Sequence, residues 1–291
     1  MKRRINGILA AIALLLVVLV LFGTAYEQVA RRRERARFRQ VGRSVDIGGR
    51  SLNIFCSGEG SPTVIFESDA LTPGYSWVYI QREIARTTRA CWYDRAGYGW
   101  SDPGPAPHTS VANAADLHEL LLRGSVKAPF VLAGDRFGSL DVRVFGSRYP
   151  EEVAGMVLVD PVLESEERMG MAGRVPFHLG YPPDFVLRVS SGIGLMRLMA
   201  HTRPESATPH GLTLDEQATL AGLEHEPKMR AAFLAEQGFM TSLAEVRTAG
   251  AVGSHSWPEM VLTGSDRRAR ADEPESVIRS VREMVRVLRH E

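Results

Sequence analysis

The residues best placed to do chemistry follow an apolar run at 130–133, where Gly134 and Gly138 enclose three residues. This spacing is typical of a nucleophile elbow, a tight turn between a strand and a helix that exposes its middle residue. The middle residue here is Arg136. Because a guanidinium keeps its proton at physiological pH, it cannot attack a carbonyl carbon. The motif therefore predicts the scaffold of an acyl-transfer site whose nucleophile position holds a cation.

Two neighbours of Arg136 are alternative nucleophiles, and neither is well placed. Asp135 offers a carboxylate, but it lies one residue before the middle position and points elsewhere on the turn. Ser139 lies beyond that position, where we expect it to pack within the helix. We therefore expect neither residue to react with a substrate.

Apolar runs and turn residues predict the elements that must position this turn. We expect strands at 45–47, 51–56, 63–67, 89–94, 130–133, 153–159 and 260–263, and helices at 77–85, 111–122 and 140–149. A last helix would place on one face Val277, Val281, Met284, Val285 and Leu288. This alternation indicates an α/β fold with a mostly parallel sheet covered by helices on both faces. Residues 162–250 interrupt it with helical, Pro-rich sequence and are predicted to form a cap over the carboxyl edge of the sheet.

The amino-terminal segment differs from the rest of the chain. Residues 5–26 carry no charge, and about 20 apolar residues are enough to span a bilayer. We expect residues 1–26 to form a transmembrane anchor, with a cleaved signal peptide as the alternative. Residues 27–44 are arginine-rich and are predicted to be a basic linker before a domain that occupies 45–291.

The sequence leaves open on which side of the membrane this domain lies. The arginines that follow the apolar segment favour a cytoplasmic domain, whereas the short basic amino terminus favours the opposite side. Cys56 and Cys91 would form a disulfide in an exported domain or would remain buried thiols. With only two cysteines, buried thiols are our expectation.

Composition excludes several other classes of protein. The 291 residues are 44% hydrophobic and 24% charged with a net charge of +1, as in a folded protein without a nucleic-acid-binding surface. No His-x-x-x-His or Cys-x-x-Cys spacing occurs. We therefore expect neither a metal site nor a cofactor.

Four segments resemble the α/β-hydrolase fold family, and in particular its membrane-anchored bacterial members. They are residues 45–50, 56–64, 93–102 and 157–161, of which Tyr-Asp-Arg-Ala-Gly-Tyr-Gly-Trp-Ser-Asp at 93–102 is the most specific. The resemblance is strong over 41–164 and weak beyond. It implies the α/β-hydrolase fold with a helical cap and, by family, a hydrolase.

The catalytic motifs of that family are altered in this chain. Its elbow is similar to Gly-His-Ser-Phe-Gly-Gly, where this chain has Gly134-Asp135-Arg136-Phe137-Gly138-Ser139. The resemblance assigns one oxyanion donor to the backbone N–H of Phe137 and the other to the loop after the strand that ends at Phe66. In that loop Asp69 replaces a glycine. Its charge would lie where a developing oxyanion should bind, and it would raise the barrier to acyl transfer.

The family also requires an acid after the next-to-last strand and a histidine after the last. If 260–263 is the next-to-last strand, Asp266 fits the acid position and the histidine is absent; if it is the last, Arg267 replaces the histidine. Residues 256–258 resemble the lead-in to the acid strand and favour the first alternative. None of the eight histidines follows a late strand, and each is expected on the surface or on a helix: His108, His118, His178, His201, His210, His225, His255 and His290.

Arg136 needs a counter-charge or access to water, because a buried unpaired cation is costly. Its candidate partners are Asp69, Asp135 and Asp266. One interpretation is an ion-paired arginine that fills an inactive site. The other is a pocket in which Arg136, Asp69 and Phe137 bind a small anionic ligand, such as a carboxylate or a phosphate.

Together these observations predict a single-pass membrane protein of the α/β-hydrolase family whose nucleophile and histidine are lost. Such a pseudoenzyme would act in binding or in structure rather than in hydrolysis. The alternative is an active hydrolase of ester-type bonds that uses an unrecognised set of residues.

Overall fold

The computed structural model describes residues 2–162, 186, 189–190, 192–195, 198, 211–224, 226–236, 256–263 and 274–290. Seven strands run through this part of the chain: β1 (Arg43–Asp46), β2 (Ser51–Ser57), β3 (Thr63–Glu67), β4 (Ala90–Tyr93), β5 (Phe130–Asp135), β6 (Val153–Val159) and β7 (Glu259–Leu262). The helices before β6 are α1 (Lys2–Arg37), α2 (Val78–Ile84), α3 (Ser110–Arg123) and α4 (Gly138–Arg148), with short 3-10 turns at Gly74–Trp77 and Pro150–Glu152. Those after it are α8 (Leu214–Glu224), α9 (Pro227–Glu236) and α12 (Pro274–Leu288).

The strands form one mixed sheet in the order β1-β2-β4-β3-β5-β6-β7. Strand β2 runs antiparallel to β1 and β4, and the remaining neighbours are parallel. Every predicted strand and helix outside the cap is present, with ends shifted by a few residues. The predicted α/β fold with a mostly parallel sheet is therefore confirmed.

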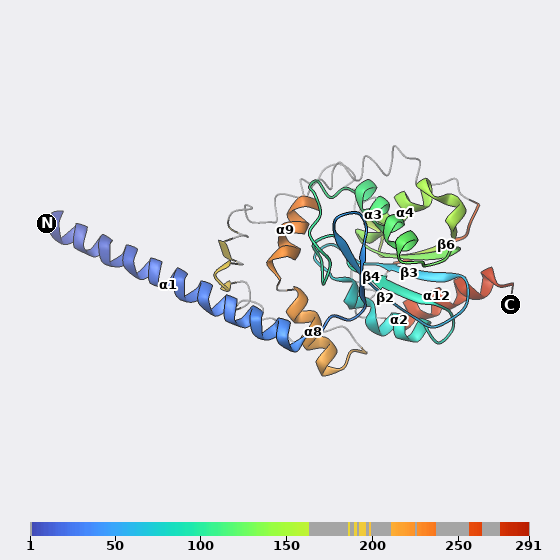
Figure 1. The fold of residues 1–291 in the computed structure, drawn as a ribbon, viewed down its shortest axis with the longest axis horizontal. Helices are drawn as coiled ribbons and strands as arrows, with labels where there is room; N and C mark the ends of the chain where they lie inside the picture. The colour runs from blue at the N-terminus through green and yellow to red at the C-terminus, as the bar shows by residue number, and fades with distance from the viewer. Residues whose placement is uncertain are drawn as a thin grey trace.

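Two layers of helices cover the sheet (Figure 1). Helices α3 and α4 pack on one face, where Leu132 and Leu158 point into the core. Helices α2 and α12 pack on the other face, against Val131 and Val157. Successive residues of a strand point to opposite faces, so these fully buried strands carry an apolar side chain at almost every position. The predicted apolar face of the last helix is also confirmed, because its residues are buried in this layer: Val277, Val281, Met284 and Val285.

Helix α1 extends away from the sheet (Figure 1). Its segment Asn6–Ala30 is long and apolar enough to cross a membrane, and an 18-residue window within it has a mean hydropathy of 3.0 and is not buried in the protein. The helix continues to Arg37, through much of the stretch expected to be a basic linker. Arginine, glutamate and alanine all favour helix, so a run without apolar periodicity still extends the helix that precedes it.

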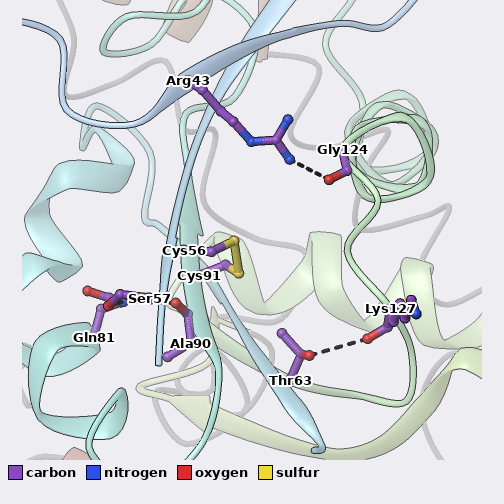
Figure 2. Close-up of a disulfide and its surroundings, with 9 residues drawn as sticks. All are labelled: Arg43, Cys56, Ser57, Thr63, Gln81, Ala90, Cys91, Gly124 and Lys127. Atoms are coloured by element: carbon purple, nitrogen blue, oxygen red, sulfur yellow. Dashed lines mark hydrogen bonds between the residues drawn. A yellow bond between two sulfur atoms is a disulfide. The ribbon is translucent and has the colours of Figure 1, made fainter. Parts of the chain in front are cut away.

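The two cysteines form a disulfide, so the expectation of two buried thiols is wrong (Figure 2). Cys56 on β2 and Cys91 on β4 are partners in the antiparallel register, with a Cα–Cα distance of 4.1 Å. The 35 residues that separate them in sequence conceal this pairing, since it depends on which strands become neighbours. Figure 2 also shows Arg43 donating a hydrogen bond to the carbonyl of Gly124 near the same sheet edge.

Only part of the predicted cap lies within the described residues. Helices α8 and α9 belong to it, and Figure 1 shows α8 near the end of α1 that joins the domain. Leu220 and Leu223 of α8 extend the core that contains α2 and α12. Met229 and Ala232 of α9 pack on Tyr98, which belongs to the loop after β4. The boundaries of the cap at 162 and 250 stay a prediction.

Candidate functional site

The turn between β5 and α4 has the backbone of a nucleophile elbow. Arg136 lies between the two elements with φ at +48°, a left-handed conformation that side chains other than glycine rarely adopt. Its N–H donates to the carbonyl of Val159 at 2.9 Å, and its own carbonyl accepts from the N–H of Ser139 at 3.1 Å. The turn packs closely against the loop after β3, since a Cβ on Gly138 would lie 2.7 Å from the carbonyl oxygen of Ser68. The chain therefore keeps the strained turn, and Arg136 occupies its middle position.

The Asp69 side chain fills the space beside this turn. Its Oδ1 accepts hydrogen bonds from the backbone N–H of Phe137 at 3.2 Å and of Ala70 at 2.8 Å. Its Oδ2 accepts from Nε of Arg136 at 3.1 Å. One N–H follows the middle residue of the elbow and the other comes from the loop after β3, which are the two sources expected for an oxyanion hole. A carboxylate of the protein itself thus occupies the position where such a hole would bind a substrate oxygen.

Burial and the neighbouring groups act on the pKa of the Asp69 carboxyl in opposing directions. Burial and, after it, the nearby Asp135 raise its pKa, whereas Arg136 and the two N–H groups lower it; together they bring the pKa to about 6. At pH 7 the group therefore stays mainly ionised and balances the charge of Arg136. A third of the Arg136 side chain remains exposed, at 32%. The pair is consequently reachable from solvent rather than sealed in the core.

A second, more deeply buried ion cluster contacts the loop that carries Asp69. Arg95, only 5% exposed, donates to Glu67 at 2.6 Å and to Glu236 of α9 at 2.9 Å. It also donates to the backbone carbonyls of Ser68 at 2.5 Å and Asp69 at 3.1 Å. The Arg95 side chain therefore joins the sheet, the loop that carries Asp69 and a helix of the cap. The sequence marked its segment as structural but gave no sign of these partners.

A cavity of about 40 Å³ adjoins the elbow and the ion cluster. Its described lining consists of Ala70, Arg95, His108, Ser110, Asn113, Phe137, Leu140, Asp141, Phe233 and Glu236. The volume is enough for a few water molecules or a very small polar group. Burial raises the pKa of Asp141 to about 6, although Arg95 and hydrogen bonds from Ser110 and Asn113 oppose this shift.

His108 lies in this cavity, which corrects the expectation of a surface or helix histidine. It belongs to the loop between β4 and α3 and is 7% exposed. Its Nδ1 makes no hydrogen bond to any residue that the structure describes. The sequence did not indicate this burial, because the loop that contains His108 has no periodic pattern. His118, in contrast, lies on α3 and bonds to Glu152 at 3.0 Å.

The remaining predicted site residues divide into two groups. Ser139 is buried in α4 and its hydroxyl donates to the carbonyl of Arg136 at 2.5 Å, in line with a packing role. Asp266 and Arg267 lie outside the described residues, so the choice between the two alignments of the last strands stays a prediction. Strand β7 pairs with β6, and within the described ranges no further strand follows it.

Among the described residues, no group of three or more His, Cys, Asp or Glu side chains is arranged to hold a metal ion. The predictions that the protein needs no metal and no cofactor remain predictions.

Comparison with known sequences gives distant matches only. No protein-family model matches the chain. It is 24% identical to the uncharacterized protein YbdG of Bacillus subtilis over 52% of this chain and 46% of that one. It is 34% identical to an uncharacterized vacuolar membrane protein of Saccharomyces cerevisiae over 34% of this chain and 16% of that one. The chain therefore spans less than half the length of these relatives.

Solved structures match over most of the chain. A putative epoxide hydrolase from Pseudomonas aeruginosa superimposes with a TM-score of 0.66 at 18% identity, over 85% of this chain and 96% of that one. The haloalkane dehalogenase DatA from Agrobacterium tumefaciens gives 0.64 at 17% identity, over 84% and 96%. An esterase from Thermogutta terrifontis gives 0.57 at 19% identity, over 84% and 98%. These likenesses, together with the strand order and the elbow, show that the chain adopts the α/β-hydrolase fold.

Proposed function

We propose that this protein is a membrane-anchored α/β-hydrolase-fold protein whose elbow no longer catalyses hydrolysis. The carrying observation is the Asp69 carboxylate, which accepts both expected oxyanion-hole N–H groups and pairs with Arg136. Acyl transfer needs a nucleophile, a base and donors that stabilise a developing negative charge. At this turn the nucleophile position holds the Arg136 cation, and the two N–H donors already bind the Asp69 carboxylate. Among the described residues, no hydroxyl or thiol of the elbow is hydrogen-bonded to a histidine ring.

Restoration of the nucleophile alone should not restore hydrolysis. The variant Arg136→Ser should hydrolyse short-chain p-nitrophenyl esters no faster than the wild-type chain, because the serine would lack a base and Asp69 would still fill the oxyanion position. The measurement is ester turnover of the purified full chain in detergent micelles. Rapid turnover by this single variant would contradict the proposal and would mean that a histidine acts as the base, either His108 or one outside the described residues.

A double variant separates the two defects. Arg136→Ser combined with Asp69→Gly removes the carboxylate from the N–H groups of Phe137 and Ala70 and still adds no base. We expect it to remain inactive as well. Turnover that appears in the double variant but not in the single one would assign the block to Asp69 alone and would contradict the absence of a base.

A second candidate function is an active hydrolase of ester-type bonds centred on the cavity. The observation that favours it is that Ser110, His108 and Asp141 line the same space beside the elbow. A serine-directed fluorophosphonate tests this candidate on the wild-type chain. Labelling at Ser110 that disappears in His108→Ala would replace the non-catalytic proposal, whereas absence of labelling at any defined serine supports it.

A small anionic ligand at Arg136 is the related binding hypothesis. The geometry sets a condition for it, because Asp69 already takes the Arg136 Nε–H and both backbone N–H groups. A carboxylate or phosphate would have to displace the Asp69 side chain. Protonation of Asp69, whose pKa is about 6, would favour this exchange, so any such ligand should bind more tightly at pH 5 than at pH 8.

The membrane anchor is proposed from α1, and its orientation from the disulfide. A disulfide between neighbouring strands persists in an oxidising compartment, which favours a domain outside the cytoplasm and a cytoplasmic amino terminus. In membrane vesicles of known orientation, the full chain should resist carbonate extraction, and Cys56 and Cys91 should react with a maleimide only after reduction. Extraction by carbonate would contradict the proposed membrane anchor. Free thiols in the freshly prepared chain would contradict the argument that the domain lies outside the cytoplasm.

A further inference from the structure

A short stretch between β6 and β7, in the predicted cap, lies directly against helix α1. A Cβ on Gly23 would be 2.6 Å from the carbonyl oxygen of Ile193, so the helix and this backbone touch with only a hydrogen between them. The backbone at Gly194 lies equally near Tyr26 and Glu27, with 3.3 Å from a Cβ at that position to Tyr26 Cδ1. Glu27 is consequently 2% exposed, although the neighbouring helix surface is open. Helix α1 and the backbone at residues 193 and 194 are therefore closely packed against each other.

Four described residues of this stretch are aliphatic and exposed, namely Val186 at 38%, Val189 at 55%, Leu195 at 43% and Leu198 at 64%. We call these four residues the apolar face. Several large aliphatic side chains exposed within one short stretch usually mark a surface that is covered in the working protein. Figure 1 shows these short helical pieces alongside α1, separate from the sheet.

The level of this contact along α1 identifies what covers the face. The segment Asn6–Ala30 has 25 residues and, at about 1.5 Å per residue, is longer than the hydrocarbon core of about 30 Å. Arg31, Arg32 and Arg33 follow it and belong at the headgroups. Gly23 and Glu27, which touch residues 193 and 194, therefore lie near the boundary between hydrocarbon and headgroups. The helix residues just before them, Leu21 and Phe22, are apolar and exposed, at 64% and 74%.

We propose that the apolar face lies in the interfacial layer of the same phospholipid bilayer that α1 crosses, so that this part of the chain is a second membrane contact. The proposal rests on the anchor role of α1. Its consequence is that the chain is held to the membrane surface at two points, α1 and the apolar face, with the sheet domain on one side of the membrane. Burial of four aliphatic side chains also makes this contact stabilising.

Depth-dependent fluorescence quenching tests this placement in the full chain. Because both native cysteines are paired, a single added cysteine can carry an NBD probe under non-reducing conditions. The informative variant is Leu198→Cys, with Val17→Cys in the middle of α1 and Val287→Cys on α12 as controls. The chain is reconstituted into phosphatidylcholine–phosphatidylglycerol vesicles that carry a spin label near the headgroup or deep in the acyl chain.

The expected result is at least a twofold loss of emission at position 198 with the shallow quencher and a smaller loss with the deep one. Position 17 should lose more emission with the deep quencher than with the shallow one. Position 287 should lose emission with neither quencher. If position 17 is quenched and position 198 is not, the apolar face does not meet lipid and only this inference fails. If neither position is quenched, the anchor itself fails. A blue-shifted but unquenched probe at position 198 would mean that protein, such as a second copy, covers the face.

Discussion

Replacing Arg95 by alanine should lower the free energy of unfolding by about 3–5 kcal/mol. The Arg95 side chain is 5% exposed, and its partners Glu67 and Glu236 are 1% and 12% exposed, so its removal leaves largely buried carboxyl groups without a counter-charge. Burial already raises the pKa of Glu67 to about 7, and Arg95 is the main group that holds it down. The loss is measured by urea unfolding of the full chain in detergent micelles, followed by far-UV circular dichroism.

The matched control for this variant is Arg123→Ala. Arg123 also forms an ion pair with a glutamate, Glu119, at 2.8 Å, but both side chains are more than 40% exposed. Water screens an exposed pair of this kind, so the expected loss is much smaller than that of the Arg95 variant. Equal losses in the two variants would show that the Arg95 cluster does not stabilise the fold. The Arg95 variant should also weaken attachment of α9, with faster hydrogen exchange over Pro227–Glu236.

A similar loss, about 3 kcal/mol or more, is expected for Asp94→Ala. Asp94 is fully buried, and its two oxygens accept from the backbone N–H of Gly74 at 2.8 Å, from the N–H of Trp100 at 3.0 Å and from Asn53 Nδ2 at 3.0 Å. Alanine would leave these three donors without an acceptor in the protein interior. Thermal unfolding of the full chain in micelles measures the effect.

Asp102→Ala is the control, because it removes a carboxylate from the same loop. Asp102 is exposed and accepts one hydrogen bond, from the N–H of Ser51 at 2.9 Å. Water can replace this acceptor, and the expected loss is about 1 kcal/mol or less. A loss of that size in Asp94→Ala would contradict the view that the segment at 93–102 is held together by the Asp94 carboxylate.

The interpretation of the elbow depends on both sequence and geometry. The sequence placed a cation at the middle position and an anion in the facing loop, and it named Asp69 as one of three partners for Arg136. The structure pairs these two side chains at 3.1 Å. It adds that the same carboxylate accepts the N–H groups of Phe137 and Ala70. This double role makes the substitution at residue 69 as important to the proposed loss of activity as the one at residue 136.

The amino-acid sequence alone is sufficient to predict the order and type of the elements, the elbow and the apolar helix at the amino terminus. These features arise from local periodicity and from glycine spacing, both of which a short window contains. It also determined the buried face of α12, whose apolar residues repeat with the helical period.

Which distant residues meet depends on the tertiary fold. Cys56 and Cys91 pair because β2 lies next to β4, and His108 is buried because α4 and α9 close over its loop. Arg95 finds Glu236 only when a cap helix packs on the loop after β4. Each of these contacts joins segments that are 35 or more residues apart or depends on the loops between elements, and no local pattern specifies such a meeting. The charge and size of a side chain can be read from the sequence, whereas its partners follow from the packing of the whole chain.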